Sequence, residues 1–158
     1  MSECCEVKQK NWPAVMACPV SGRRSKQVEL LTLRSLLRQL PLAMPSTAYY
    51  FCDDPACDVV YFGADPNAPL FRRADLWVRV GLKEKADPIP VCYCFGFTRK
   101  DIQDEIRHEG KSIIAEKIKA EVQAGRCACE IKNPSGKCCL GNVTKVIKNG
   151  LTALTTGT

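Results

Sequence analysis

The chain has 158 residues, of which 46% are hydrophobic and 25% charged, and its formal net charge is +6. The length suits one domain or two small ones, and the composition is that of an ordinary globular protein. No run approaches the ~18 apolar residues of a membrane span, and none resembles a secretory signal, so we expect a cytoplasmic protein without membrane insertion. Lysine and arginine are scattered along the chain, which argues against a nucleic-acid partner.

Eleven residues are cysteines, and six of these lie between positions 91 and 141. In a reducing compartment this number favours metal binding over disulfides, and an odd count excludes complete pairing within one chain. Thiolate sulfur is the preferred ligand of zinc, copper(I) and iron–sulfur clusters. The cysteines therefore predict sites for soft metals.

In the N-terminal third, the sequence predicts a tail, a turn that carries a cysteine, and one helix. Residues 1–17 are expected to be loosely ordered, and they carry two adjacent cysteines. Cys18 opens a tight turn that ends at Gly22. From residue 28 to residue 40 leucines recur on one helical stripe, and Pro41 ends the predicted helix.

The next segments predict a β-hairpin with a thiol on each side of its turn. Residues 47–52 and 58–62 are rich in aromatic and β-branched side chains, and turn-forming residues separate them. Cys52 and Cys57 flank this turn at a spacing found in zinc knuckles, although two small hydrophobic side chains in a sheet would give the same pattern. Residues 76–81 alternate and predict a third strand.

The C-terminal half predicts two helices. Thr98 opens a variant of the capping box, and Gly110 ends the helix that follows it. Ser112 can cap a second helix, which Gly125 ends. The residues after Asn149 have no strong pattern and are expected to fray.

Because the two helices would run antiparallel, they would return the later cysteines to the earlier ones, Cys92 and Cys94. A 2Fe–2S cluster needs four ligands, two on each iron, and these two thiols can bind one iron. The candidates for the second iron are Cys127, Cys129, Cys138 and Cys139. The only histidine, His108, is interpreted as a solvated side chain near a helix end.

The predicted fold class is α+β: a small β-hairpin zinc module with one helix, followed by a helical-hairpin 2Fe–2S module. The predicted boundaries are a tail at 1–17, the zinc module at 18–82, a linker at 83–90, the cluster module at 91–148 and a second tail at 149–158.

Three stretches resemble the N-terminal metal-binding domain of CopZ-type copper chaperones: Trp77–Cys94, the hairpin Phe51–Phe62, and the segment Cys129–Cys139 with its Asn-Pro-Ser-Gly turn. The resemblance covers residues 18–140. Its second half is also similar to 2Fe–2S domains of the bacterioferritin-associated ferredoxin type. The resemblance implies a 2Fe–2S cluster and a separate mononuclear zinc ion.

Aligning the Asn-Pro-Ser-Gly turn carries the cluster ligands onto Cys92, Cys94, Cys129 and Cys139, with Cys127 and Cys138 as runners-up. The zinc ligands carry over to Cys18, Cys52 and Cys57.

The chain departs from the family pattern at the first knuckle, where Ser21 stands in place of a second cysteine. The candidates for the fourth zinc ligand are Cys4, Cys5, Asp53 and water.

The favoured function is one-electron transfer linked to copper handling, either reduction of Cu(II) to Cu(I) or electron supply to a copper-trafficking partner. Extra thiols would bind Cu⁺. The alternatives are a non-redox heavy-metal carrier or metal sensor, and a structural protein that holds zinc at both sites. CopZ-type chaperones also carry a C-terminal copper-binding domain, which is not among these 158 residues. No nucleophile–base–orienter set is visible, so a hydrolase is disfavoured.

Overall fold

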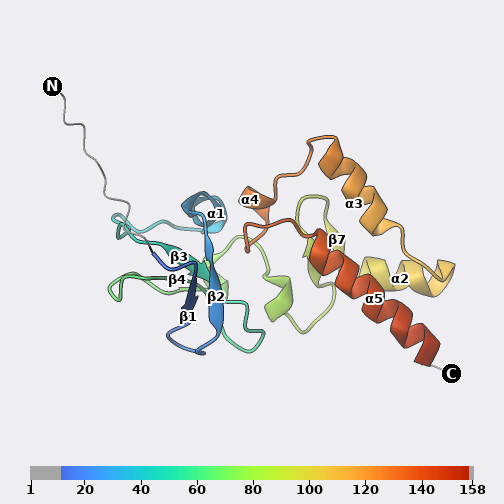
Figure 1. The fold of residues 1–158 in the computed structure, drawn as a ribbon, viewed down its shortest axis with the longest axis horizontal. Helices are drawn as coiled ribbons and strands as arrows, with labels where there is room; N and C mark the ends of the chain where they lie inside the picture. The colour runs from blue at the N-terminus through green and yellow to red at the C-terminus, as the bar shows by residue number, and fades with distance from the viewer. Residues whose placement is uncertain (1–11, 157–158) are drawn as a thin grey trace.

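The computed structural model describes residues 12–156. Figure 1 shows an antiparallel sheet on one side of the molecule and a group of helices on the other, with the short helix α4 (Cys129–Lys132) between them. The predicted mixed α and β architecture with an antiparallel sheet is confirmed. None of the described helices combines the length and the apolar character needed to cross a bilayer.

The sheet has five strands in chain order, and each strand pairs with the next in antiparallel orientation. They are β1 (Val15–Ala17), β2 (Arg24–Val28), β3 (Tyr49–Phe51), β4 (Val59–Gly63) and β5 (Phe71–Arg72). Aromatic and β-branched side chains make β3 and β4 the centre of the sheet, as the predicted hairpin requires. Helix α1 (Leu30–Leu36) adds its apolar side to one face.

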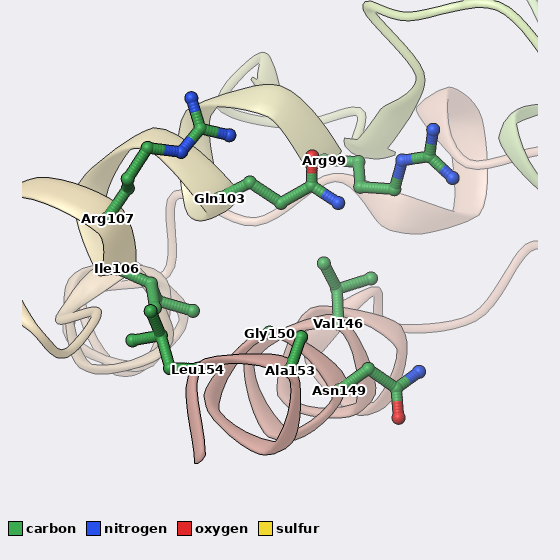
Figure 2. A pocket seen from close by; sticks show the side chains of 9 residues that line it. All are labelled: Arg99, Gln103, Ile106, Arg107, Val146, Asn149, Gly150, Ala153 and Leu154. Atoms are coloured by element: carbon green, nitrogen blue, oxygen red, sulfur yellow. The ribbon is translucent and has the colours of Figure 1, made fainter. Parts of the chain in front are cut away.

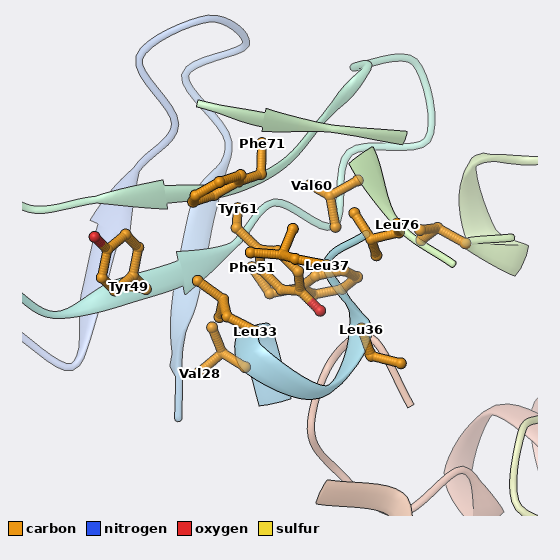
Figure 3. Close-up of a cluster of buried hydrophobic side chains, with 11 residues drawn as sticks. Val28, Leu33, Leu36, Leu37, Tyr49, Phe51, Val60, Tyr61, Phe71 and Leu76 are labelled. Carbon is orange, nitrogen blue, oxygen red and sulfur yellow. The ribbon is translucent and has the colours of Figure 1, made fainter. Parts of the chain in front are cut away.

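Both faces of the sheet are buried, because its side chains alternate between two clusters. On one face Phe51 and Tyr61 pack with Leu33 of α1, and Figure 3 shows this cluster. On the other face the rings of Tyr50 and Phe62 stack with their centroids 5.4 Å apart. This second cluster also contains three of the cysteines, so the sheet core and the thiols are built together.

Three features of this half differ from the predictions. Strands β1 and β2 were not predicted, and β1 lies in the segment expected to be a tail, because their polar and short sequences carry little strand pattern. The predicted strand at 76–81 is absent, since Leu76 makes only an isolated bridge and Trp77 is 64% exposed. Helix α1 is shorter than predicted, because Val28 belongs to β2 and the backbone is already extended at Leu37, which bridges Leu76.

The second half consists of a small strand pair and four helices. The elements are β6 (Pro90–Cys92), β7 (Phe97–Thr98), α2 (Arg99–Glu109), α3 (Ile114–Gln123), α4 and α5 (Leu140–Thr156). The capping box is confirmed: the Thr98 hydroxyl accepts a hydrogen bond from the Asp101 amide, and the Asp101 carboxylate accepts one from the Thr98 amide. Gly110 ends α2 with φ of 74°, a backbone angle that favours glycine.

Helix α5 corrects the prediction of a frayed C-terminal tail. It runs through residue 149 and packs along α2, so the helical part is a three-helix arrangement rather than a hairpin. Gly150 permits the close approach, because a Cβ there would lie 2.8 Å from the Ile106 side chain. A groove of about 470 Å³ remains between the two helices, lined by residues such as Arg107 and Leu154 (Figure 2).

The expected linker, 83–90, is fastened to the rest of the molecule. The Arg79 guanidinium donates to the Pro88 and Ala86 carbonyls at 2.6 and 2.9 Å. The Arg99 amide donates to the Ile89 carbonyl at 2.8 Å. These hydrogen bonds fix in place a segment that the sequence predicts to be a linker.

Helix α4 and the loop that follows it dock directly on the sheet half. The Tyr61 hydroxyl donates to the Pro134 carbonyl, and the Thr32 hydroxyl donates to the Glu130 carbonyl at 2.6 Å. Gly136 lies against α1, where a Cβ would be 2.8 Å from the Thr32 hydroxyl, and its φ is 71°. The two halves are therefore joined through the loop that carries the last cysteines.

Replacing Gly136 with alanine should lower the free energy of unfolding by about 2 kcal/mol, because the new Cβ meets Thr32 and the backbone angle becomes strained. Chemical denaturation followed by circular dichroism measures this. Gly141→Ala is the matched control, since nothing lies within 4 Å of its Cβ position. The control should change stability by less than about 1 kcal/mol. Equal effects of both variants would contradict the docking described above.

Candidate metal centres

Two turns of the sheet bring three cysteines together. Cys18 lies between β1 and β2, while Cys52 and Cys57 flank the turn between β3 and β4. All three are buried, and their sulfur atoms lie within 4.8 Å of one another. The structure thus assembles the three residues that the CopZ resemblance assigns to zinc.

Hydrogen bonds from neighbouring turns reach two of these sulfur atoms, those of Cys18 and Cys52. Burial raises the pKa of the Cys18 thiol, but hydrogen bonds from the Ser21 amide and hydroxyl and from the Val20 amide outweigh burial, and the pKa is lowered. Burial dominates at Cys52 and raises its pKa, although the Ser21 hydroxyl and the Asp54 amide oppose it. The turns thus direct donors toward sulfur atoms that would carry negative charge.

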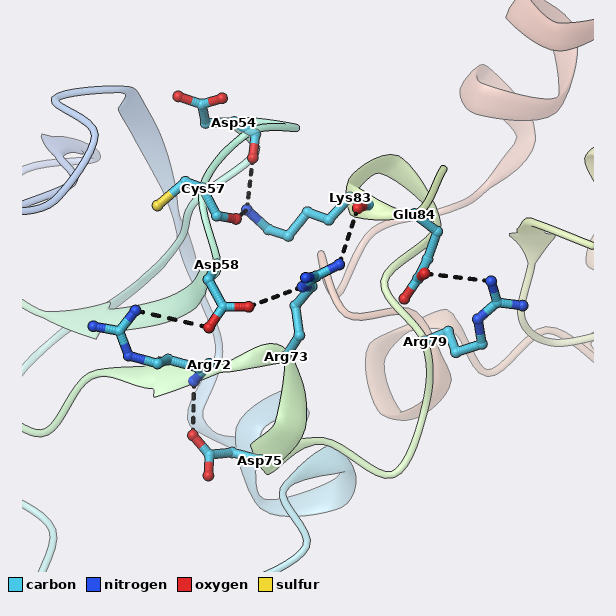
Figure 4. A network of polar contacts seen from close by, with 9 residues as sticks. All are labelled: Asp54, Cys57, Asp58, Arg72, Arg73, Asp75, Arg79, Lys83 and Glu84. Atoms are coloured by element: carbon cyan, nitrogen blue, oxygen red, sulfur yellow. Dashed lines mark hydrogen bonds and ion pairs between the residues drawn. The ribbon is translucent and has the colours of Figure 1, made fainter. Parts of the chain in front are cut away.

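A buried lysine adjoins this three-cysteine site (Figure 4). Lys83 is 3% exposed, and its ammonium donates to the carbonyls of Asp54 and Cys57 at 2.8 and 2.9 Å. Burial lowers the pKa of Lys83, while the charges of nearby thiolates oppose that shift. Sequence analysis missed this residue, because a lysine that opens a charged segment carries no recognisable signal.

The candidates for a fourth zinc ligand differ in their contacts and in their exposure. The Asp53 carboxylate accepts from the Arg23 guanidinium at 2.9 Å, and its side chain is 47% exposed. The Ser21 hydroxyl lies 3.5 Å from the Cys52 sulfur. Cys4 and Cys5 lie outside the described residues. Among these candidates, the Ser21 hydroxyl is the one whose contact with a cysteine sulfur is described.

A second cysteine set lies within the second half of the molecule, in the same cluster as Ile102 and Val143. Cys92 ends β6, Cys94 follows in the turn to β7, Cys129 begins α4, and Cys139 directly precedes α5. The sulfur atoms of Cys92 and Cys139 are 3.1 Å apart, and those of Cys94 and Cys129 are 3.2 Å apart. The structure therefore brings together the four residues that the resemblance assigns to the cluster.

The close pairs differ from the expected pairing of Cys92 with Cys94. Each pair joins the β6–β7 turn to the α4–α5 segment, because the docked loop sets these two segments against each other. The thiol of Cys139 donates to Cys92 and lowers the pKa of Cys92 to about 6, helped by the amides of Phe95 and Cys94. The same contact raises the pKa of Cys139.

Cys127 and Cys138, the alternative cluster ligands, occupy different environments. Cys127 is half-buried, and its sulfur lies 3.3 Å from that of Cys129 and 4.0 Å from that of Cys94. Cys138 is exposed. His108 is exposed on α2, where its Nδ1 lies 2.7 Å from the Asp104 carbonyl, so it does not face the cysteines.

The donor atoms determine which metals these centres suit. Each set offers thiols and no histidine, which suits zinc, copper(I) or an iron–sulfur cluster and disfavours magnesium and calcium. Two separate groups of three cysteines have their sulfur atoms within 4.8 Å: the Cys18 group, and Cys94 with Cys127 and Cys129.

Comparisons with known proteins agree with this geometry. Residues 15–76 match a family model described as a zinc binding domain. The copper chaperone CopZ of Archaeoglobus fulgidus is 34% identical over 126 residues, which cover 79% of this chain and 58% of that protein. The X-ray structure of the Archaeoglobus fulgidus CopZ N-terminal domain matches with a TM-score of 0.68 at 32% identity, covering 83% of this chain and 97% of that one.

The chain belongs to the family of the CopZ N-terminal domain. The CopZ-like part of the resemblance drawn from the sequence is therefore confirmed, and residues 15–76 match a zinc-binding domain. The chain spans 58% of the length of the curated relative.

Replacing Cys139 with serine should remove most of the metal bound by the second cysteine set, because Cys139 is 1% exposed and its sulfur contacts that of Cys92. Inductively coupled plasma mass spectrometry of anaerobically purified protein measures the metal content. Cys138→Ser is a control one residue away, and it should retain the wild-type content because Cys138 is exposed. Metal loss from Cys138→Ser with retention by Cys139→Ser would reverse this assignment.

Proposed function

We propose that the four thiols of Cys92, Cys94, Cys129 and Cys139 hold a 2Fe–2S cluster, and that the protein transfers single electrons in copper handling. The observation that carries the proposal is the arrangement of these thiols as two close pairs, at 3.1 and 3.2 Å. Two pairs of thiolates are the ligand set that a 2Fe–2S cluster requires. When bound, such a cluster supplies one electron at a time.

The surrounding residues suit this role. Amides of Cys94, Phe95 and Phe97 donate to the Cys92 sulfur, and the Ala128 amide donates to the Cys94 sulfur at 3.3 Å. Hydrogen bonds to the sulfur atoms stabilise the anionic form and tune the reduction potential of a bound cluster. Apolar neighbours such as Ile102 and Val143 exclude water from the buried side.

One edge of the cysteine set reaches toward the surface, which gives electrons a route in and out. Cys94 and Cys127 are half-buried, whereas Cys92, Cys129 and Cys139 are buried. A redox partner would therefore approach from the side of Cys94. We propose that this partner and the copper-trafficking partner are separate proteins of the cytoplasm, where thiols remain reduced.

The three-cysteine site of Cys18, Cys52 and Cys57 would hold zinc. Metal binding adds to the folding free energy of small domains. Since these cysteines belong to the same cluster as the stacked rings of Tyr50 and Phe62, zinc would stabilise the sheet on which the loop between α4 and α5 docks.

Copper is the substrate in this proposal. Cu(II) accepts one electron and becomes Cu(I), a soft ion that thiolates bind. Cys127 and Cys138 are thiols beyond the proposed cluster ligands, and they could capture the product. The relative named copper chaperone CopZ supports a role in copper handling.

A second candidate function is that of a non-redox heavy-metal carrier or sensor. The observation that favours it is the group of Cys94, Cys127 and Cys129, whose sulfur atoms lie within 4.8 Å of one another. Three thiolates suit a single soft ion such as Cu(I). Binding of that ion would compete with the proposed cluster for two of its four ligands.

Anaerobically reduced protein mixed with one equivalent of Cu(II) should regain its oxidised visible spectrum and yield Cu(I), trapped by a Cu(I)-specific chelator. Cys92→Ser should leave only the slower reduction by free thiols, because Cys92 belongs to one of the two close pairs. Cys138→Ser is the matched control and should behave as the wild type in rate. Stopped-flow absorbance follows both the cluster bands and the copper chelate.

Equal Cu(I) yield and rate from the wild type and Cys92→Ser would remove the cluster from the reaction. A colourless protein that contains zinc and no iron would also overturn the electron-transfer proposal. In either case the carrier function would become the better account of the second cysteine set.

A further inference from the structure

The position of Ser21 bears on what kind of site the three cysteines of the sheet form. Its hydroxyl lies 3.5 Å from the Cys52 sulfur and also bonds to the Cys18 sulfur. In a tetrahedral zinc site with ordinary bond lengths, a sulfur and an oxygen ligand lie about 3.6 Å apart. The Ser21 oxygen therefore lies at a distance from the Cys52 sulfur that suits the fourth corner of the site.

This corner faces the surface, unlike the other three. Cys18, Cys52 and Cys57 are buried, whereas Ser21 is exposed in the turn between β1 and β2. Asp53 is held away by its ion pair with Arg23. Structural zinc sites are closed by four protein ligands, while sites that exchange ligands keep one position open.

The positive charge of Lys83, beside the three-cysteine site, matches the net charge of a metal ion bound by three thiolates. The ammonium of Lys83 is buried, and it donates to two carbonyl oxygens, those of Asp54 and Cys57. A buried cation is costly unless an opposite charge compensates it. Three thiolates with one divalent ion carry a net charge of −1, which Lys83 balances.

We propose that Cys18, Cys52 and Cys57 form an open three-thiolate centre, in which the fourth position of the metal, beside Ser21, is exchangeable for an external thiol. In the resting state that position is filled by an oxygen, from the Ser21 hydroxyl or from water. An incoming thiol forms a metal–sulfur bond and releases its proton to solvent, while the metal–oxygen bond breaks. No electrons move in this exchange.

Such a centre can pass a soft metal to, or receive one from, the thiol of another molecule, because each transfer of this kind begins with a shared metal–sulfur bond. A closed four-cysteine site has no position at which that bond can form. The inference concerns the sheet half alone and does not depend on a cluster at the second cysteine set.

X-ray absorption at the zinc edge of the full-length protein tests this directly. The wild type should show about three sulfur ligands and one oxygen ligand per zinc, at about 2.3 and 2.1 Å. Addition of 2-mercaptoethanol should raise the sulfur count to about four. Ser21→Cys should show about four sulfur ligands without added thiol and should not respond to it.

Ser35→Cys is the matched control, because Ser35 is exposed on α1 and its hydroxyl bonds only to the Leu31 carbonyl. It should retain the wild-type ligand count and the response to thiol. Exchange of bound zinc for an isotope of zinc, followed by native mass spectrometry, should be at least about tenfold slower in Ser21→Cys than in the control.

Two results would overturn the inference: four sulfur ligands in the wild type without added thiol, or no change in the sulfur count of the wild type when thiol is added. Failure of the proposed cluster is a separate outcome. It would appear as two zinc ions and no iron per chain, whereas the difference between Ser21→Cys and Ser35→Cys would remain.

Discussion

The structure depends on the docking of one loop, between α4 and α5, onto the sheet. The Tyr61 hydroxyl bonds to the Pro134 carbonyl in this loop, and the Thr32 hydroxyl bonds to the Glu130 carbonyl in α4, directly before it. Buried hydroxyl groups need such partners, so the loop and the sheet satisfy each other. This contact, together with the hydrogen bond from the Ala128 amide to the Cys94 sulfur, sets Cys129 and Cys139 opposite the turn that carries Cys92 and Cys94.

The same contact links the two metal centres. The sheet face that receives the loop contains Tyr61, and the opposite face of the same sheet contains Cys52 and its partners. A metal that stabilises one face therefore supports the surface on which the other centre is assembled. This arrangement explains why a small protein can place two thiol-rich sites on a modest hydrophobic core.

Electrostatics distinguishes the two centres. At the sheet site, a buried lysine and several amide donors favour a compact anionic group of thiolates. At the second set, amide donors stabilise Cys92, and among the described residues no buried lysine or arginine lies against those sulfur atoms. The sheet site is thus organised around charge balance, while the second set is organised around hydrogen bonds and apolar cover.

The sequence by itself determined the cysteine sets, the hairpin of β3 and β4, and the capping box at Thr98, because each depends on residues close together in the chain. It did not determine the partners of the thiols, since the pairing of Cys92 with Cys139 depends on a loop that docks across the molecule. Helix α5 was missed because its stability comes from packing along α2 rather than from its own residues. Lys83 and Ser21 acquired their significance only in the tertiary structure, because charge balance and an open coordination corner are properties of residues gathered in space.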